Sequence, residues 1–321
     1  MPGSSFGRDC QIRALYDAVT APELDPIILF YGQSGVGKSS VLDAGLLPRL
    51  EESHQLRYLR RDQTLGLTGT LMTALDGQHE SSAAAWRAIE AAADRPLLIV
   101  LDQAEEAYTR PNPRYRHELA DLADALHGIF TDPANRPRPR GRLILAFRKE
   151  WLAEIDQRLE ERDLARTRSP IETIDRRGII EAITGPTRTP RLRTKYRLEI
   201  DKGLAKEIAD NLGADLQSPI APTLQILLTK LWEQAHRIDD DTPRFSRELY
   251  LALKKKGILL NDIPEAATRR AGETLSRRRR ERTGAGYPRL LHHPPRDGGT
   301  AQCRRPGEAL PKQRDLSAGV R

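Results

Sequence analysis

Apolar residues in the first 175 positions form short continuous runs that alternate with longer stretches of helical spacing. Continuous runs at 27–31, 97–101 and 142–147 are typical of buried strands. Shorter runs at 56–60 and 171–174 predict two further strands. Helices are expected over 9–20, 38–50, within 66–95 and over 151–164. This alternation predicts an α/β fold with a three-layer parallel sheet and right-handed crossovers.

The pattern changes after residue 175, where only helical periodicity follows. Helices are expected over 178–184, 202–212, 222–237 and 246–256. The third carries an apolar stripe that includes Leu224, Leu227 and Leu231, and Pro222 suits its first position. We therefore expect three parts: a core (1–175), a small all-helical lid domain (176–260) and a remainder (261–321).

One glycine-rich segment between the first strand and the following helix fits the pattern G-x-x-x-x-G-K-[ST]. It comprises Gly32, Gln33, Ser34, Gly35, Val36, Gly37, Lys38 and Ser39, and Ser40 follows. Glycines let the backbone approach phosphate oxygens, and the helix N-terminus offers unpaired N–H groups. Lys38 would reach the β- and γ-phosphates, and the Ser39 hydroxyl would ligate Mg²⁺. The core is therefore predicted to be a P-loop NTPase.

Asp102 closes the run at 97–101, at the carboxyl end of a predicted strand. There it would lie beside the phosphate loop and hold Mg²⁺ together with Ser39 as a Walker B aspartate. The alternative is a helix N-cap role, since residues 103–106 could begin a helix.

Three charged residues beyond these strand ends are candidates for catalysis. Glu105 or Glu106 would orient or deprotonate an attacking water, although both equally suit the first turn of a helix. Gln103 directly follows Asp102 and is a poor base, which predicts slow hydrolysis. Arg148, after the run at 142–147, would sense the γ-phosphate, or else pair with a nearby carboxylate.

The net charge of +7 comes from the C-terminal segment alone. Residues 261–321 hold fourteen basic and seven acidic residues, which leaves 38 of each in residues 1–260. This Arg-, Pro- and Gly-rich segment lacks helical period and is expected to be disordered. It would be a solvated tail, a nonspecific grip on nucleic acid, or an out-of-frame translation of a GC-rich gene. Translating the other two frames would test the last interpretation.

Cysteine usage and hydropathy bear on localisation. Cys10 and Cys303 form neither a metal-ligand spacing nor a disulfide framework. No apolar stretch approaches a membrane span, and the N-terminus has no apolar signal region. We expect a cytoplasmic protein with no membrane contact.

Four stretches together resemble the STAND class of signal-transduction ATPases, specifically the novel STAND NTPase family of microbial multidomain proteins. Residues 6–9 (Phe-Gly-Arg-Asp) resemble its N-terminal motif. Residues 32–50 resemble its phosphate loop and helix, including an Ala-Gly-Leu-Leu-Pro-x-Leu continuation. Residues 101–106 are similar to its Asp-Gln-Phe-Glu-Glu signature, with Ala104 in place of the aromatic, and residues 145–148 resemble its sensor strand. The resemblance covers about residues 5–260.

The resemblance implies binding of ATP or ADP with Mg²⁺, an ADP-held resting state, and opening or homo-oligomerisation on nucleotide exchange. It places Arg8 near the adenine and lets the lid close on the nucleotide through a proline, for which Pro222 is the candidate. Sensor or effector modules, normal in the family, are not visible here, so they would be separate or missing.

The leading interpretation is a slowly hydrolysing ATP-dependent switch in microbial conflict or regulatory signalling. The alternatives are a nucleotide-stabilised scaffold that leaves ATP intact or a truncated, pseudogene-like fragment, and then a nucleic-acid binder that uses the basic tail. No guanine-specific Asn/Thr-Lys-x-Asp motif is apparent, which favours adenine.

Overall fold

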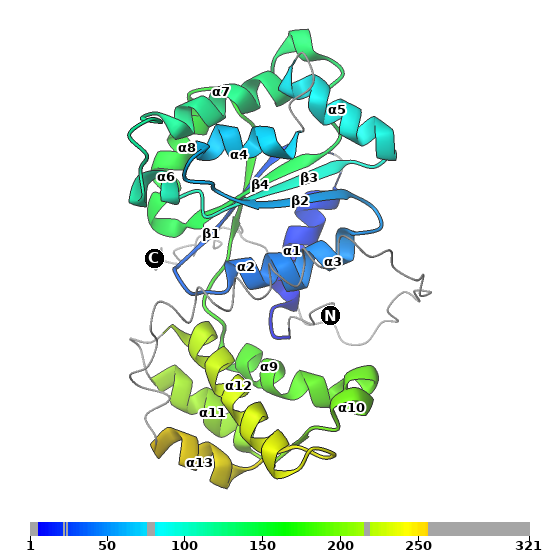
Figure 1. Cartoon of the computed structure of the whole chain (residues 1–321), viewed down its shortest axis with the longest axis vertical. Helices are drawn as coiled ribbons and strands as arrows, with labels where there is room; N and C mark the ends of the chain where they lie inside the picture. The colour runs from blue at the N-terminus through cyan, green and yellow to red at the C-terminus, as the bar shows by residue number, and fades with distance from the viewer. Residues whose placement is uncertain (1–5, 22, 24, 76–80, 215–218, 256–321) are drawn as a thin grey trace, which may run out of the picture. The chain divides into compact units, whose positions relative to one another are not determined.

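The computed structural model contains a five-stranded sheet whose strands all run parallel (Figure 1). Its strands are β1 (Ile27–Gly32), β2 (Gln55–Arg60), β3 (Leu97–Asp102), β4 (Arg142–Arg148) and β5 (Arg166–Pro170). They lie in the order β2-β3-β4-β1-β5. The carboxyl ends of β1 to β4 share one edge, since Gly32 pairs with Arg148 and Arg60 with Asp102. The predicted α/β fold is confirmed.

The structure describes residues 6–21, 23, 25–75, 81–214 and 219–255. All of them belong to one compact unit, which ends at residue 268. The predicted tail, 261–321, lies outside the described residues, and the proposed domain boundaries stay predictions.

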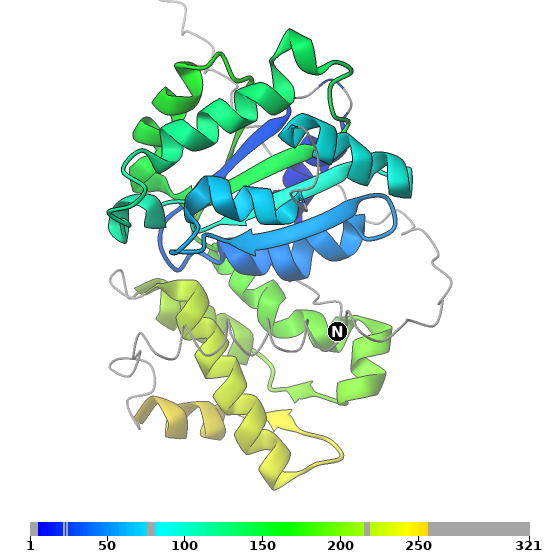
Figure 2. The same cartoon turned by 45° about the horizontal axis from the view of Figure 1, so that its top comes forward.

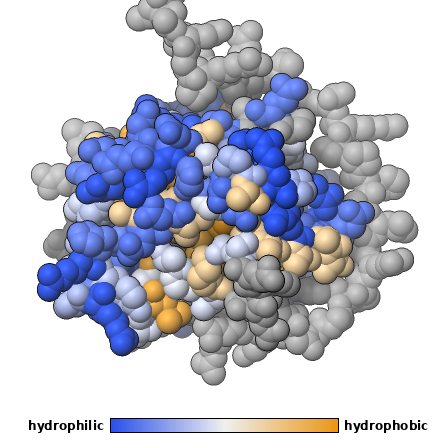
Figure 3. Space-filling view, turned by 90° about the horizontal axis from the view of Figure 1, so that it is seen from above, coloured by the Kyte–Doolittle hydropathy of each residue, from blue (hydrophilic) through white to orange (hydrophobic). Residues whose placement is uncertain are grey.

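Helices cover both faces of the sheet and complete the three layers (Figures 1 and 2). Alternate strand residues point to opposite faces, so the core divides into two clusters. One cluster packs against α1 (Asp9–Thr20) and the helix that follows the phosphate loop. The other packs against α4 (Gly66–Ala74), α5 (Ser82–Ala93), α7 (Glu118–Phe130) and α8 (Leu152–Glu160). Seen from the side of α5 and α7, the surface carries many hydrophilic residues, with a band of more apolar residues between them (Figure 3).

The helix predicted over 38–50 is continuous but not uniform. It begins as α2 (Lys38–Ser40), widens into π-helical turns over η1 (Val41–Leu46) and ends as α3 (Leu47–Leu50). Pro48 lies just after the wide turns and has no N–H to donate. Gly45 lies against Ile12 of α1, since a Cβ there would come 2.7 Å from its Cδ1. The π-helical turns were not predicted.

The last strand of the sheet differs from its prediction. The strand expected over 171–174 is wrong: β5 runs from Arg166 to Pro170 and has no strongly apolar side chain. Polar contacts replace apolar packing on this edge strand, where Arg166 Nε bonds Asp156 Oδ1 at 2.6 Å and Thr167 Oγ1 donates to Asp25 Oδ2 at 2.9 Å. The helix expected over 151–164 is also shorter, since α8 ends at Glu160.

A helical part follows the sheet and has its own apolar core. It contains α9 (Arg176–Arg188), α10 (Pro190–Tyr196), α11 (Leu204–Ala214), α12 (Ile220–Ile238) and α13 (Arg247–Lys255). Two elements were not predicted. They are α10 and a short parallel pair, β6 (Glu199–Ile200) with β7 (Arg244–Phe245), so this part is not purely helical.

Pro222 is the third residue of α12 rather than the first, because the helix begins at Ile220 after Pro219. The position is still compatible with proline, since the first four N–H groups of a helix have no intrahelical acceptor. No helix among the described residues is both long and apolar enough to cross a membrane.

Candidate nucleotide-binding site

The phosphate loop joins β1 to α2 at the carboxyl edge of the sheet. Gly35 and Gly37 have φ angles of 73° and 98°, which residues with a Cβ rarely adopt. Gln33, Ser34, Gly35 and Ser40 are exposed, whereas Val36 is buried in the core. This arrangement leaves the loop accessible at the helix N-terminus, where unpaired N–H groups favour anions.

Lys38 points back onto its own loop. Its Nζ donates to the carbonyls of Gly32 and Gln33 at 3.0 and 3.1 Å. Burial lowers the pKa of the Lys38 ammonium, while the nearby carboxylates of Glu105 and Asp102 act in the opposite direction. The charged end therefore lies among the predicted site residues rather than in bulk solvent.

Ser39 and Asp102 meet as predicted. The Ser39 hydroxyl donates to Asp102 Oδ2 at 2.8 Å, and Asp102 is 1% exposed. The N–H of Gln103 donates to the other carboxylate oxygen at 2.9 Å. A hydroxyl and a carboxylate at this position are oxygen ligands of the kind that Mg²⁺ takes.

Tyr58 of β2 is a third partner of Asp102 that the sequence did not reveal. Its hydroxyl donates to Asp102 Oδ2, and burial raises the pKa of the phenol far above its usual value. The phenol therefore stays neutral and continues to donate. The alternating run at 56–60 predicts a strand. It does not predict which strand lies next to it, and so it does not predict that Tyr58 meets Asp102.

Glu105 faces the phosphate loop from the segment after β3. It is 5% exposed, and its Oε1 pairs with Arg148 Nε at 3.1 Å. Its Oε2 is buried and has no hydrogen-bond partner among the described residues. Burial raises the pKa of this carboxyl, against the opposing charges of Lys38 and Arg148.

Glu106 has a different environment although it is the next residue. It begins α6 (Glu106–Thr109) and pairs with Arg110 at 3.1 Å, one helical turn ahead on the surface. The structure thus separates two glutamates that the sequence left equivalent. Arg148 ends β4 beside Gly32, with a half-exposed side chain, and its observed partner is Glu105.

Gln103 connects β3 to Glu105 through an unusual backbone turn. Its φ of 64° is left-handed, which is uncommon for a residue with a side chain and is often found at functional sites. The turn lets the Ala104 N–H donate to the Ala146 carbonyl at 3.1 Å. Ala104 is fully buried, so the small side chain fits directly against the sheet.

Arg8 and Pro222, the two candidates taken from the family resemblance, both lie against the loop. Arg8 is 5% exposed and donates to the carbonyls of Val36 at 2.7 Å and Glu172 at 2.6 Å. Burial lowers the pKa of its guanidinium, and Asp175 acts in the opposite direction. A Cβ placed on Gly35 would come 3.4 Å from Pro222 Cγ. The start of α12 therefore packs on the phosphate loop.

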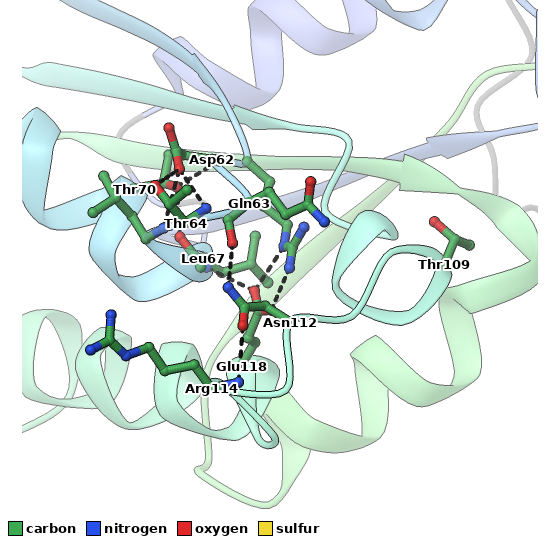
Figure 4. A network of polar contacts seen from close by, with 12 residues as sticks. Asp62, Gln63, Thr64, Leu67, Thr70, Thr109, Asn112, Arg114 and Glu118 are labelled. Carbon is green, nitrogen blue, oxygen red and sulfur yellow. Dashed lines mark hydrogen bonds and ion pairs between the residues drawn. The ribbon is translucent and has the colours of Figure 1, made fainter.

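A second polar cluster lies on the same edge, after β2 (Figure 4). Arg61 and Glu118 are both buried and form a two-point ion pair, with Arg61 Nε at 2.8 Å from Glu118 Oε2. Glu118 also accepts the Leu67 N–H at 3.0 Å, while Asn112 Nδ2 donates to the Gln63 carbonyl at 2.8 Å. The cluster ties the loop between β2 and α4 to the start of α7. The Arg61 N–H bonds the Asp102 carbonyl at 3.3 Å, which connects it to the site.

The chain belongs to the Novel STAND NTPase 1 family, whose model matches residues 4–306. This confirms the resemblance seen in the motifs and identifies a P-loop NTPase, which implies nucleotide binding. A comparison with curated proteins gave no match.

Solved structures with a similar fold include the ORC1 protein of Aeropyrum pernix in complex with DNA. That match has a TM-score of 0.50 at 14% identity and covers 78% of this chain and 65% of the other, so this chain spans less than two thirds of ORC1. A chain of the E. coli MS115-1 HORMA:CdnC:Trip13 complex matches with a TM-score of 0.48 at 18% identity, over 78% of this chain and 79% of the other. At 14% identity the likeness to ORC1 shows the fold alone.

Proposed function

We propose that this STAND NTPase binds ATP with Mg²⁺ at the phosphate loop, hydrolyses it slowly, and changes state between ADP and ATP forms. The observation that carries the proposal is the Glu105 carboxylate. It is buried, one of its oxygens has no hydrogen-bond partner among the described residues, and it lies in the electrostatic field of Lys38 and Asp102. A buried carboxylate with a raised pKa beside a phosphate-binding loop is suited to general-base chemistry.

Each group has a distinct task in this proposal. The loop N–H groups and Lys38 bind the phosphates, and Ser39 and Asp102 hold Mg²⁺. The ion supplies charge neutralisation at the phosphate oxygens. The direct Ser39–Asp102 hydrogen bond brings both oxygen ligands together, and the Tyr58 hydroxyl donates to the same carboxylate oxygen and helps to orient it.

Hydrolysis requires one proton transfer from water. Glu105 accepts the proton as the water oxygen bonds to the γ-phosphorus and the bond from that phosphorus to the β–γ bridging oxygen breaks. The products are ADP and inorganic phosphate. Arg148 would release Glu105 and stabilise charge on the transferring group. The Glu105–Arg148 ion pair and Gln103 after Asp102 both favour slow turnover.

The contacts of Arg8 and Pro222 support the switch. Arg8 bonds the loop through Val36, and the start of α12 packs on Gly35. Bound phosphate would therefore act on groups that also hold the helical part. We propose that exchange of ADP for ATP changes these contacts and exposes a surface for self-association or for a separate effector in signalling.

The first experiment measures co-purified nucleotide and single-turnover ATP hydrolysis of the full chain, with Lys38→Ala as the comparison. Bound ADP and slow turnover that both depend on Lys38 would support the proposal. Absence of nucleotide from a folded wild-type protein would overturn it.

A second candidate is a scaffold that binds ATP without cleaving it. The ion pair of Glu105 with Arg148 favours it, because a paired carboxylate is a weaker base. Bound ATP that stays intact over many hours in the same experiment would select this function.

A further inference from the structure

The helical part contains a short segment rich in basic residues, separate in sequence from the phosphate loop. Residues 185–199 contain five basic residues (Arg188, Arg191, Arg193, Lys195 and Arg197) and one acidic residue, Glu199. Residues 1–260 as a whole are balanced in charge. This segment is therefore a local exception.

Other arginines of the helical part are paired with carboxylates. Four such pairs are Arg176–Asp210, Arg177–Glu181, Arg244–Asp201 and Arg247–Glu207. By contrast, Arg188, Arg193 and Arg197 are exposed and form no ion pair or side-chain hydrogen bond with any residue that the structure describes. Three guanidinium groups are thus available to a ligand.

These three arginines surround a hollow of about 830 Å³. Pro190, Arg193, Thr194 and Arg197 are spaced so that one face of α10 lines it. Arg188 comes from the end of α9, Leu198 from the residue before β6, and Ile200 from β6 itself. Arg191 and Lys195 do not line it.

The size and chemistry of the hollow fit a small phosphorylated molecule. Its volume lies within the usual range of small-molecule sites, about 300–1,000 Å³. Guanidinium groups bind phosphate through paired N–H donors, and each phosphate group carries more charge than a carboxylate. The arginines come from separate positions, one at the end of α9 and two that are one helical turn apart at the end of α10, so each can pair with a different phosphate group. This arrangement, with Glu199 as the single carboxylate among the lining residues, matches a ligand with at least two phosphate groups. The apolar surface from Leu198 and Ile200 would receive an organic portion.

The backbone at Arg197 adds an independent observation. Arg197 directly follows α10 and has a φ of 46°, a left-handed conformation in which glycine is favoured. An arginine here costs conformational free energy relative to glycine, so replacing it with glycine is not expected to destabilise the fold. We infer that this hollow is a second anion site, distinct from the phosphate loop, which binds a small organic polyphosphate.

The test uses inorganic tripolyphosphate as probe and isothermal titration calorimetry of the full chain. All proteins carry Lys38→Ala and are titrated without Mg²⁺, to suppress binding at the phosphate loop. Arg193→Gln should weaken binding at least 10-fold. Arg191→Gln removes the same charge from the other face of α10 and should change the dissociation constant by less than 2-fold.

A second variant separates binding from folding. Arg197→Gly should weaken tripolyphosphate binding about 10-fold. The Tm should stay equal or rise by about 2 °C, because glycine adopts the left-handed conformation at this position without a steric cost. Equal weakening by Arg191→Gln and Arg193→Gln would overturn the inference in favour of nonspecific charge attraction. So would unchanged affinity in Arg193→Gln or no binding of the probe at millimolar concentration. Tighter binding of a single-stranded oligonucleotide, weakened equally by Arg191→Gln, would overturn it in favour of a nucleic-acid surface.

Discussion

Glu105 and Glu106 are adjacent in the chain, yet their side chains meet opposite surroundings. Glu105 is buried against the phosphate loop, and Glu106 pairs with Arg110 along α6. The left-handed turn at Gln103 sets this difference, because it directs the following residues onto the edge of the sheet. The backbone conformation at Gln103 therefore determines which of the two glutamates can act at the phosphate loop.

The first prediction uses this pair as its own control. Glu105→Gln should reduce single-turnover ATP hydrolysis at least about 100-fold, because a general base contributes at least that much. Glu106→Gln removes the same charge one residue away and should leave the rate within about 3-fold. Rapid quench of bound ATP measures both. Equal losses in the two variants would reject Glu105 as the base.

The second prediction concerns pH and stability without nucleotide. Because burial raises the pKa of Glu105, the folded protein holds this proton more tightly than the unfolded chain. The free energy of unfolding therefore falls as the pH rises from the unfolded pKa, about 4.3, to the folded pKa. Glutamine does not titrate, so the stability of Glu105→Gln relative to wild type should increase with pH across this window. Urea unfolding at several pH values between 4 and 8 measures the difference, and a constant or falling difference would contradict the raised pKa.

Single elements are held by polar groups as well as by apolar packing, as Glu90 of α5 shows. This carboxylate is 4% exposed and accepts four N–H groups. They come from the Trp86 indole at 3.0 Å and from the backbone of Leu97, Arg140 and Gly141 at 3.0, 2.9 and 2.6 Å. Since Leu97 begins β3 and Gly141 precedes β4, one side chain joins α5 to the amino ends of two central strands.

The third prediction follows from this cluster. Glu90→Gln should lower the free energy of unfolding by about 2 kcal/mol, because an amide has one acceptor oxygen where the carboxylate has two, so at least one of the four N–H donors then faces the NH₂ group. Asp94→Asn is the comparison four residues along, where the aspartate side chain is 95% exposed and makes only a 3.4 Å pair with Arg140. It should cost less than about 0.5 kcal/mol. Urea unfolding distinguishes the two, and similar small losses would show that the cluster contributes little.

The spacing of apolar residues predicted those helices and strands that are held mainly by apolar packing. The helix over 9–20 and the runs ending at Asp102 and Arg148 were predicted well because continuous or periodic apolar residues specify burial. The strand β5 was misplaced because its polar side chains are satisfied by Asp156 of the preceding helix and by Asp25 from a distant part of the chain, which the pattern of the strand does not reveal.

The same limit applies to the site. The pairing of Ser39 with Asp102 followed from parallel strand ends, a general rule of α/β folds. Tyr58 and the Arg61–Glu118 pair depend on which strands and helices are neighbours, which the pattern does not specify. The burial of Glu105 depends on the left-handed turn at Gln103. Glutamine has no preference for this conformation, so the sequence does not predict the turn.

At the scale of the whole described unit, the N-terminal segment joins the phosphate loop to α9. Phe6 lies against Gly185, Gly7 against Gly178, and Arg8 donates to Val36 of the loop. Three consecutive residues therefore contact two regions more than 100 positions apart in the chain. We expect a movement of α9 to displace the phosphate loop through the contacts of this segment.

The fourth prediction tests that coupling with two glycines that share a backbone conformation. Gly7 has φ of 77°, and a Cβ there would lie 2.2 Å from the Gly178 carbonyl oxygen, whereas Gly203 has φ of 87° with nothing within 4 Å. Gly203→Ala should lower the free energy of unfolding by about 1 kcal/mol, the cost of a left-handed conformation for a residue with a Cβ, and should leave ADP affinity unchanged. Gly7→Ala adds a backbone collision, so it should cost about 3 kcal/mol and weaken ADP binding roughly 10-fold as Arg8 is displaced. Urea unfolding and fluorescent-ADP titration measure the two effects. If both variants lost equal stability and kept full affinity, the segment would be a passive N-terminus and not a connection between α9 and the nucleotide site.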